Sequence, residues 1–534
     1  MTGRRSRAAE RLESSGVRRA LARAFWPCGG RRISRARRSN VMPGERKIVV
    51  IGAGIAGLCA AVYARKCGYA VELVEQHDRA GGLATSWRRG DYVFETCMHW
   101  LVGSRPGGVL HAEWQEVCEI DSLRFVDHDE FLRIEDERGA QLCIYTDVGR
   151  LEAELLSVGP EDENEIRHLT KAVRQLVDLP MPPIGESGLA RLASMFRMLP
   201  DLPLVWRLAH ISLGDYGLRF RNPLLRSFFR DGATPNLSAL ALILSLAWMS
   251  GRNAGYAIGG SQALIRSVVD RLQALGGTIR YETRVERILV ENDTAFGVVL
   301  DSGEIVPADW VISAADGHAT LHALLGGRYH DPAFDKAFAR YEAFPSYVQV
   351  SLGLARPLSG EPGYLTLRAE SPVEVDPLTR LDALAFRIFN YDPTFAPAGK
   401  TAVTCFLPTR NSAWWAGLRH DDPTAYQAAK HRAAEAVIEV LGRRLPGVRD
   451  DIEIVDVSTP ATVIRFTGNW QGSMEGWLMT PETGFGTLPQ TLPRLKRFLM
   501  AGHWVQPGGG LPSGLMTARS AVQAICREDH VVFA

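Results

Sequence analysis

Three glycines near the start of the chain have the spacing of a phosphate-binding loop. Gly52, Gly54 and Gly57 follow the apolar run KIVVI and open a segment with helical periodicity. In such a loop Gly52 permits the tight turn, Gly54 lets backbone amides approach a pyrophosphate, and Gly57 lets the helix pack against the strand. The pyrophosphate then lies at the positive end of the helix, beside Ile55 and Ala56. The stretch therefore predicts a dinucleotide site.

A carboxylate further along narrows the choice of dinucleotide. Glu75, followed by Gln76, ends the next apolar run, roughly 20 residues after the third glycine. A carboxylate in this position accepts hydrogen bonds from both hydroxyls of an adenosine ribose, whereas a 2′-phosphate would favour arginine. The pair of motifs therefore favours FAD or NAD over NADP.

Three separate blocks of sequence supply the elements that must position this site. In the first, a strand at 47–51, a helix ended by Gly68 and a strand at 70–75 form a βαβ unit. The second (256–315) begins with a helix for which Ser261 is the expected N-cap, and continues with four β-like runs. The third (497–528) is predicted as strand, glycine-rich loop and helix. We expect an α/β fold, with a Rossmann-like parallel sheet assembled from three chain segments.

Two further motifs resemble a known superfamily and point to FAD. The segment DRAGGLATSW (78–87) resembles the second FAD signature of the amine oxidase and phytoene desaturase superfamily, and AGHWVQPGGGLPSGLMTARSAVQAI resembles the C-terminal signature of carotenoid desaturases. TRVERI (283–288) is similar to the strand whose backbone meets the adenine in that group. Many relatives have an acidic residue where His503 stands. The residues to which the resemblance assigns FAD contacts are Arg79, Gly81, Gly82, Leu83, Ala84, Val285, Gly502, His503, Gly510, Leu511 and Pro512.

The resemblance implies FAD as the cofactor and a GR2-type FAD-binding domain interleaved with an α+β substrate domain. FAD-binding segments are expected at 43–105, 256–322 and 466–534, and substrate-domain segments at 106–255 and 323–465, the first with possible membrane association. Residues 1–42 hold twelve Arg and two acids. They are interpreted as a disordered or untranslated extension with Met42 as the true start, or as a phosphate-binding arm.

Composition describes an ordinary globular chain with no nucleic-acid partner. Hydrophobic residues make up 46% of the sequence, and the net charge is +1. The eight cysteines form no C-x-x-C pair, which favours a reducing, cytoplasmic compartment and no metal site. The run LSALALILSLAWM is too short to span a bilayer. The Arg-, Trp- and Leu-containing segment 191–230 predicts either ordinary core helices or peripheral contact with the inner face of a membrane. No pattern specifies an oligomeric state.

The segment ETCMHWLVGSRPGG (95–108) follows the second FAD motif and should approach the flavin. His99 is its candidate catalytic residue, and Cys97 is a weaker candidate for covalent flavin attachment. No second G-x-G-x-x-G is present for a nicotinamide cofactor, so oxygen, a quinone or another acceptor would reoxidise the flavin.

The resemblance to phytoene desaturases, carotenoid isomerases and retinol saturases implies a function. The expected protein is an FAD-dependent oxidoreductase acting on CH–CH groups of a lipophilic polyene or isoprenoid, by desaturation, saturation or isomerisation. One alternative is a flavin amine oxidase. Another is a non-catalytic escort of prenylated proteins on the same scaffold, like the Rab GDP dissociation inhibitors.

Overall fold

The computed structural model describes residues 46–179, 198–484 and 486–534. The extension predicted at 1–42 lies outside these residues. So does the start of the predicted interfacial segment, 191–197.

A parallel five-stranded sheet forms the framework of the glycine loop. Its strand order is β10-β2-β1-β14-β20, and every neighbouring pair is parallel. Strands from all three predicted blocks meet in this sheet, so the prediction of an α/β fold assembled from three segments is confirmed. The individual domain boundaries stay a prediction. The strands are β1 (Lys47–Ile51), β2 (Ala70–Val74), β10 (Thr278–Arg280), β14 (Trp310–Ser313) and β20 (Phe498–Met500).

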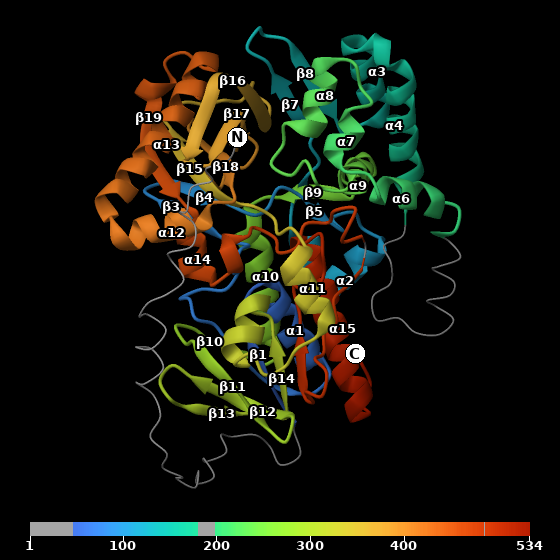
Figure 1. Cartoon of the computed structure of the whole chain (residues 1–534), viewed down its shortest axis with the longest axis vertical. Coiled ribbons are helices and arrows are strands. Elements are labelled where there is room, and N and C mark those ends of the chain that lie inside the picture. Colours follow the sequence, from blue (N-terminus) through green and yellow to red (C-terminus); the bar gives the residue numbers. More distant parts are fainter. Residues whose placement is uncertain (1–45, 180–197, 485) are drawn as a thin grey trace, which may run out of the picture. The chain divides into compact units, whose positions relative to one another are not determined.

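Different layers cover the two faces of the parallel sheet. Ile48 and Val50 of β1 pack into a core with the helices, whereas Val49 and Ile51 pack into a second core with an antiparallel three-stranded sheet. This alternation follows from the opposite directions of successive side chains in a strand. In Figure 1 these layers surround β1 and β14 in the lower half of the picture. The covering elements are α1 (Ile55–Lys66), α10 (Gly260–Ala274), α15 (Gly510–Asp529), β11 (Val285–Glu291), β12 (Thr294–Leu300) and β13 (Ile305–Pro307).

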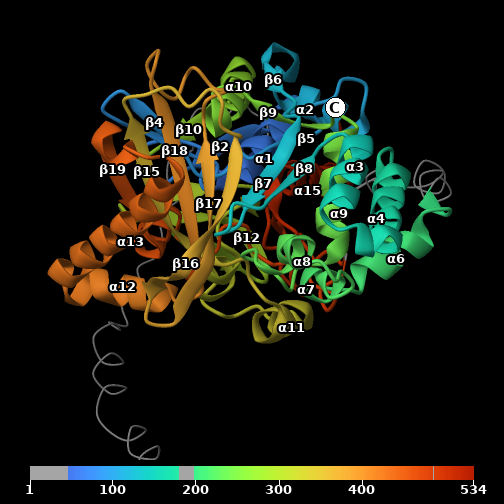
Figure 2. The same ribbon diagram turned by 90° about the horizontal axis from the view of Figure 1, so that it is seen from above.

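A seven-stranded sheet dominates the other half of the fold. Its order is β19-β15-β18-β17-β16-β7-β8, antiparallel except where β16 meets β7. Helix α13 packs along one face through an apolar core, as Figure 2 shows. The elements are β7 (Glu130–Glu135), β8 (Gln141–Tyr145), β15 (Ser346–Leu354), β16 (Tyr364–Asp376), β17 (Thr379–Ile388), β18 (Thr401–Thr409), β19 (Ile452–Ser458) and α13 (Pro423–Arg444).

A group of helices packs beside β7 and β8 around its own apolar core. The apolar run noted in the sequence forms α9, which is buried within this group. The helices are α3 (Val148–Val158), α4 (Glu163–Leu176), α6 (Leu202–Ala209), α7 (Leu213–Gly217), α8 (Pro223–Arg230) and α9 (Ala239–Ser250).

Smaller elements connect these layers. The hairpin β3–β4 contacts β18 of the seven-stranded sheet and helix α10, and the short sheet β5-β9-β6 contacts helices α9, α10 and α15. The bounds are β3 (Ser86–Arg89), β4 (Tyr92–Glu95), β5 (Leu101–Val102), β6 (Phe125–Val126), β9 (Ala254–Ala257), α2 (Val109–Val117), α11 (Pro332–Arg340), α12 (Ser412–Asp421), α14 (Pro460–Thr467), η2 (Ile120–Ser122), η3 (Pro160–Asp162), η4 (Ala319–Leu324), η5 (Val448–Asp451) and η6 (Trp470–Gly472).

The start of α10 differs from the sequence prediction. The helix begins at Gly260, and its N-cap is Gly259 in the left-handed conformation, so the predicted cap at Ser261 is wrong. Ser261 lies in the first turn, and its hydroxyl donates to the buried carboxylate of Glu95 at 2.6 Å. A long-range carboxylate therefore takes the role expected of a local cap.

Within the described ranges, no helix is both long and apolar enough to cross a bilayer. Leu202 and Trp206 of α6 and Leu218 after α7 are exposed, while Leu204, Leu208 and Leu213 are buried in the helical core. Peripheral membrane contact through this segment stays a prediction.

Candidate functional site

A cavity of about 260 Å³ lies at the carboxyl ends of the parallel strands. We call it the glycine-loop cavity. Residues from β1 and β2, and those directly after β14, line it together with segments near 81–84, 466–475 and 501–514. Open α/β sheets bind ligands in this position, because loops and helix N-termini converge there.

The β1–α1 turn depends on glycine at two positions. Gly52 has φ +93°, which other residues rarely adopt, and a Cβ at Gly57 would overlap the carbonyl oxygen of Gly52. Gly54 is the N-cap of α1 and offers no side chain to the first-turn amides. These amides therefore remain available to an anion at the helix N-terminus.

Glu75 is held at one end of the glycine-loop cavity with Gln76 and Val285. Its carboxylate accepts hydrogen bonds from the backbone N–H of Ala53 at 2.7 Å and of His77 at 2.8 Å. Burial raises the pKa of Glu75, although the two amides oppose the shift. The amides orient the carboxylate toward the cavity, and this fits the predicted ribose contact.

The second predicted motif packs directly on the glycine loop. Gly81 and Gly82 have positive φ, and Gly54 forms a bridge with Gly81. Gly81, Gly82, Leu83 and Ala84 all line the cavity. Arg79 does not line it; its half-exposed side chain instead pairs with the neighbouring Asp78.

The C-terminal motif closes the opposite side. Gly502, His503, Gly510 and Leu511 line the cavity, and α15 begins at Gly510. Pro512 lies in the first turn of α15 and Gly57 lies inside α1; neither lines the cavity.

His503 has an unusual environment. Burial lowers the pKa of His503 to about 4, so the imidazole is neutral near pH 7. Its buried Nε2 has no hydrogen-bond partner among the described residues. The side chain is therefore available to a bound group.

Two acids in the glycine-loop cavity were not predicted from the sequence. Burial raises the pKa of Asp316 to about 6, although the carboxylate accepts hydrogen bonds from the amides of Ala319 and Trp470. Burial also raises the pKa of Glu475 to about 7. Neither residue belongs to a recognisable sequence motif. Only the folding of distant segments brings them to this cavity.

The lining residues fit a dinucleotide. A glycine turn with free helix amides suits a pyrophosphate, Glu75 suits a ribose, and His503 offers an unsatisfied polar atom. The fit extends from Glu75 at one end to the N-terminus of α15 at the other.

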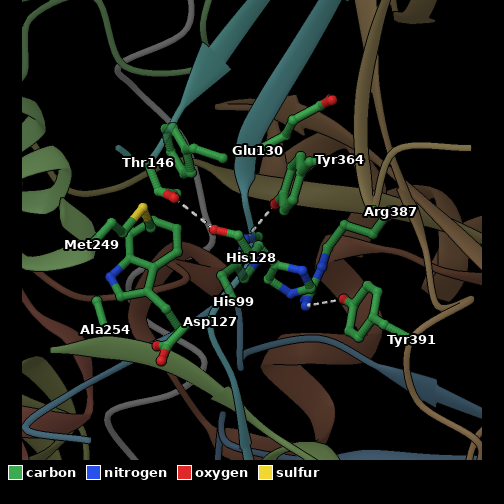
Figure 3. A pocket seen from close by; sticks show the side chains of 13 residues that line it. His99, Asp127, His128, Glu130, Thr146, Met249, Ala254, Tyr364, Arg387 and Tyr391 are labelled. Atoms are coloured by element: carbon green, nitrogen blue, oxygen red, sulfur yellow. Dashed lines mark hydrogen bonds between the residues drawn. The ribbon is translucent and has the colours of Figure 1, made fainter. Parts of the chain in front are cut away.

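A second, smaller cavity of about 30 Å³ contains His99. We call it the aromatic pocket (Figure 3). The hydroxyl of Tyr364 forms a hydrogen bond with Nδ1 of His99. Burial, assisted by the charge of Arg387, holds the pKa of His99 well below its ordinary value. His99 is thus a neutral residue outside the glycine-loop cavity, and its catalytic role stays a prediction. The lining residues are His99, Trp100, Asp127, His128, Glu130, Phe131, Thr146, Met249, Ala254, Gly363, Tyr364, Arg387 and Tyr391.

One short segment borders both cavities. Cys97 lines the glycine-loop cavity, whereas His99 and Trp100 line the aromatic pocket. Burial raises the pKa of the Cys97 thiol, and this keeps the thiol protonated and disfavours covalent attachment of a cofactor. In the described ranges, no group of three or more His, Cys, Asp or Glu could hold a metal ion.

Sequence comparison places the chain among flavin enzymes. The family model described as "Flavin containing amine oxidoreductase" matches residues 55–526. A phytoene desaturase (neurosporene-forming) of Rhodobacter capsulatus is 25% identical over 516 residues, covering 90% of this chain and 94% of the relative. Prolycopene isomerase 1 of an Oncidium hybrid cultivar is 25% identical, covering 84% and 76%.

Solved structures share the fold. Wild-type putrescine oxidase bound to putrescine has a TM-score of 0.58 at 15% identity, covering 91% of this chain and 99% of that one. An oxidoreductase from Methanosarcina mazei has a TM-score of 0.57 at 19% identity, covering 89% and 100%.

The family match covers most of the chain and explains the lining of the glycine-loop cavity. The predicted resemblance to desaturase- and isomerase-like flavoproteins is confirmed, and so is FAD as the cofactor. The non-catalytic escort alternative is not retained. The chain belongs to the flavin containing amine oxidoreductase family and is an FAD-dependent oxidoreductase.

Proposed function

We propose that this enzyme acts on CH–CH groups of a lipophilic, carotenoid-like polyene, by desaturation, saturation or isomerisation. The observation that carries the proposal is the likeness, over nine-tenths of the chain, to enzymes named for polyenes. The aromatic lining of the small pocket next to the glycine-loop cavity supports it, because the end of a conjugated chain packs well against aromatic rings.

In this proposal the glycine-loop cavity holds FAD. The β1–α1 turn and the α1 N-terminus bind the pyrophosphate, Glu75 binds the ribose, and Gly502 with the N-terminus of α15 borders the flavin end. When bound, FAD supplies an acceptor or donor of hydride. The protein's own contribution is to exclude water and to provide a proton-exchanging group, for which Glu475 has a suitable pKa of about 7.

An amine substrate is the alternative that the family name raises. The aromatic pocket contains the buried cation Arg387, which would repel an ammonium group. Trp504 could supply one wall of an aromatic cage, but its indole donates to Asn469 and packs edge-on against Trp477. These contacts favour a polyene over an amine.

Anaerobic mixing of the purified holoenzyme with candidate substrates tests the proposal. We expect flavin absorbance bands in the oxidised protein. Carotenoids or retinoids should bleach these bands if the enzyme desaturates them, or change their double-bond geometry without net bleaching if it isomerises them, whereas putrescine and cyclohexylamine should do neither. Reoxidation by a product polyene would show the saturating direction. A protein without flavin bands, or one bleached by amines alone, would refute the proposal.

A further inference from the structure

Arg387 is a buried cation for which the described residues provide no counter-ion. The residue lies on β17, only 1% exposed, and its side chain lines the aromatic pocket. Its Nη2 donates to the hydroxyl of Tyr391 at 3.2 Å, while Nε and Nη1 have no hydrogen-bond partner in the described part of the chain. A guanidinium carries five N–H donors, so most of them are unsatisfied.

Aromatic rings offset only part of the cost of burying this charge. The guanidinium carbon lies 4.7 Å from the ring centroid of Phe389, 5.5 Å from that of Tyr364 and 5.7 Å from that of Tyr256. Cation–π contacts are weaker than the desolvation penalty of a buried ion. The positive charge of Arg387 is therefore only partly compensated.

Acids near the pocket are engaged elsewhere. The carboxylate of Glu130 is bound by Arg133 at 2.7 Å, and that of Asp392 accepts hydrogen bonds from Tyr256 and the amide of Gly259. In Figure 3, Asp127 lies on the opposite side of the pocket from Arg387. None of these carboxylates neutralises the guanidinium.

Neighbouring polar groups make this end of the pocket rich in donors. Tyr391 accepts from Arg387, so its own hydroxyl proton remains to be donated. Burial holds the pKa of His128 at about 4, so this imidazole adds no second positive charge. The volume of about 30 Å³ suits a head group of a few atoms, so an apolar chain attached to it would extend beyond the pocket.

The geometry points to the aromatic pocket as a binding site for the carboxylate of a lipophilic acid, with Arg387 as the counter-ion. Because Cys97, His99 and Trp100 join the two cavities, an acid held here lies beside the flavin site. The identification of that acid as the polyene substrate rests on the proposed function. The anion site itself does not.

Binding of matched acids and alcohols to the holoenzyme tests the inference. Equilibrium dialysis would compare dodecanoate with dodecanol, which carry no polyene, and retinoate with retinol, which do. We expect each acid to bind about 10- to 100-fold more tightly than its alcohol, since charge-assisted hydrogen bonds discriminate to this extent. The preference should fall below threefold in Arg387→Gln and Arg387→Met. It should persist in Arg380→Gln, which removes an exposed arginine from the same strand.

Thermal unfolding separates this role from a structural one. Replacement of an uncompensated buried charge by a neutral side chain should leave Tm unchanged or raise it. Dodecanoate should raise Tm in the wild-type enzyme and in Arg380→Gln, but not in the Arg387 variants. Equal affinity for acid and alcohol in the wild type would overturn the inference, since water would then satisfy Arg387. So would an acid preference that survives in both Arg387 variants. If dodecanoate shows the expected preference but no polyene bleaches the oxidised flavin, reoxidises the reduced flavin or is isomerised, the anion site stands and the proposed function fails.

Discussion

At the scale of single residues, Glu475 is an acid whose charge depends on pH in the neutral range. It lines the glycine-loop cavity, and burial raises the pKa of its carboxyl from 4.5 to about 7. The folded protein binds this proton more tightly than the unfolded chain does. The contribution of the protonated carboxyl to the free energy of unfolding is therefore fully present below about pH 4.5 and is lost as pH rises through 7.

Glu475→Gln should therefore stabilise the protein at high pH more than at low pH. The neutral amide avoids the cost of an ionised buried carboxylate, which amounts to at most about 3 kcal/mol for such a shift. We expect the Tm of the variant to exceed that of the wild type at pH 8, and the difference to shrink at pH 5. Glu482→Gln, at a nearby exposed position, is the control. A Tm difference that does not change with pH would contradict the raised pKa.

The residues of the site differ in how far the sequence predicts them. A short motif identifies Gly52, Gly54 and Glu75, because their roles depend on local backbone conformation and on fixed spacing within one βαβ unit. Arg387 follows the run LDALAF, which contains Asp382, in a strand whose other arginine, Arg380, is exposed. Nothing nearby in the sequence marks Arg387 as buried. Its environment comes from strands and loops far apart in the sequence, which single-sequence reasoning does not bring together.

At the scale of elements, one carboxylate joins the end of β4 to the start of α10. Glu95 is fully buried. It accepts hydrogen bonds from the amides of Thr96, Cys97 and Met98, and from both the amide and the hydroxyl of Ser261. The strands and helices are predictable because periodicity is a local sequence pattern. The start of α10 is not, because it depends on a contact between residues far apart in the sequence. Glu95 also fixes the segment that borders both cavities.

Glu95→Gln should destabilise the fold and disturb that segment. The amide NH2 would face backbone donors, leaving buried groups unsatisfied, and we expect a loss of about 3 kcal/mol in the free energy of unfolding. Urea denaturation followed by circular dichroism measures the loss, and flavin content reports on the cavity. Glu439→Gln removes an exposed carboxylate that pairs with Arg443 on α13, and it should cost less than about 1 kcal/mol. Equal midpoints for the two variants would be incompatible with the role given to Glu95.

At the scale of the whole molecule, both cavities are built from segments spread through most of the chain. Among the residues that the structure describes, those that line the two cavities lie between Ile51 and Gly514. A protein that begins at Met42 retains every one of them, together with Arg46, which pairs with Asp529 near the end of α15.

The shortened protein should therefore keep the flavin content and Tm of the full chain within experimental error. Absorbance of bound flavin per mole of protein and a thermal melt would test this directly. Loss of flavin on removal of residues 1–41 would show that the extension contributes to the cofactor site.

The position of β20 and α15 has a consequence for biosynthesis. The motif that marks the nucleotide site emerges from the ribosome early, but β20 and the loop carrying Gly502 and Gly510 are made some 450 residues later. Until these residues have been translated, the parallel sheet lacks an edge strand and the cavity lacks a wall. We therefore expect the cofactor to bind only late in synthesis. A transcript interrupted before codon 498 would encode an intact glycine loop but an incomplete cofactor site.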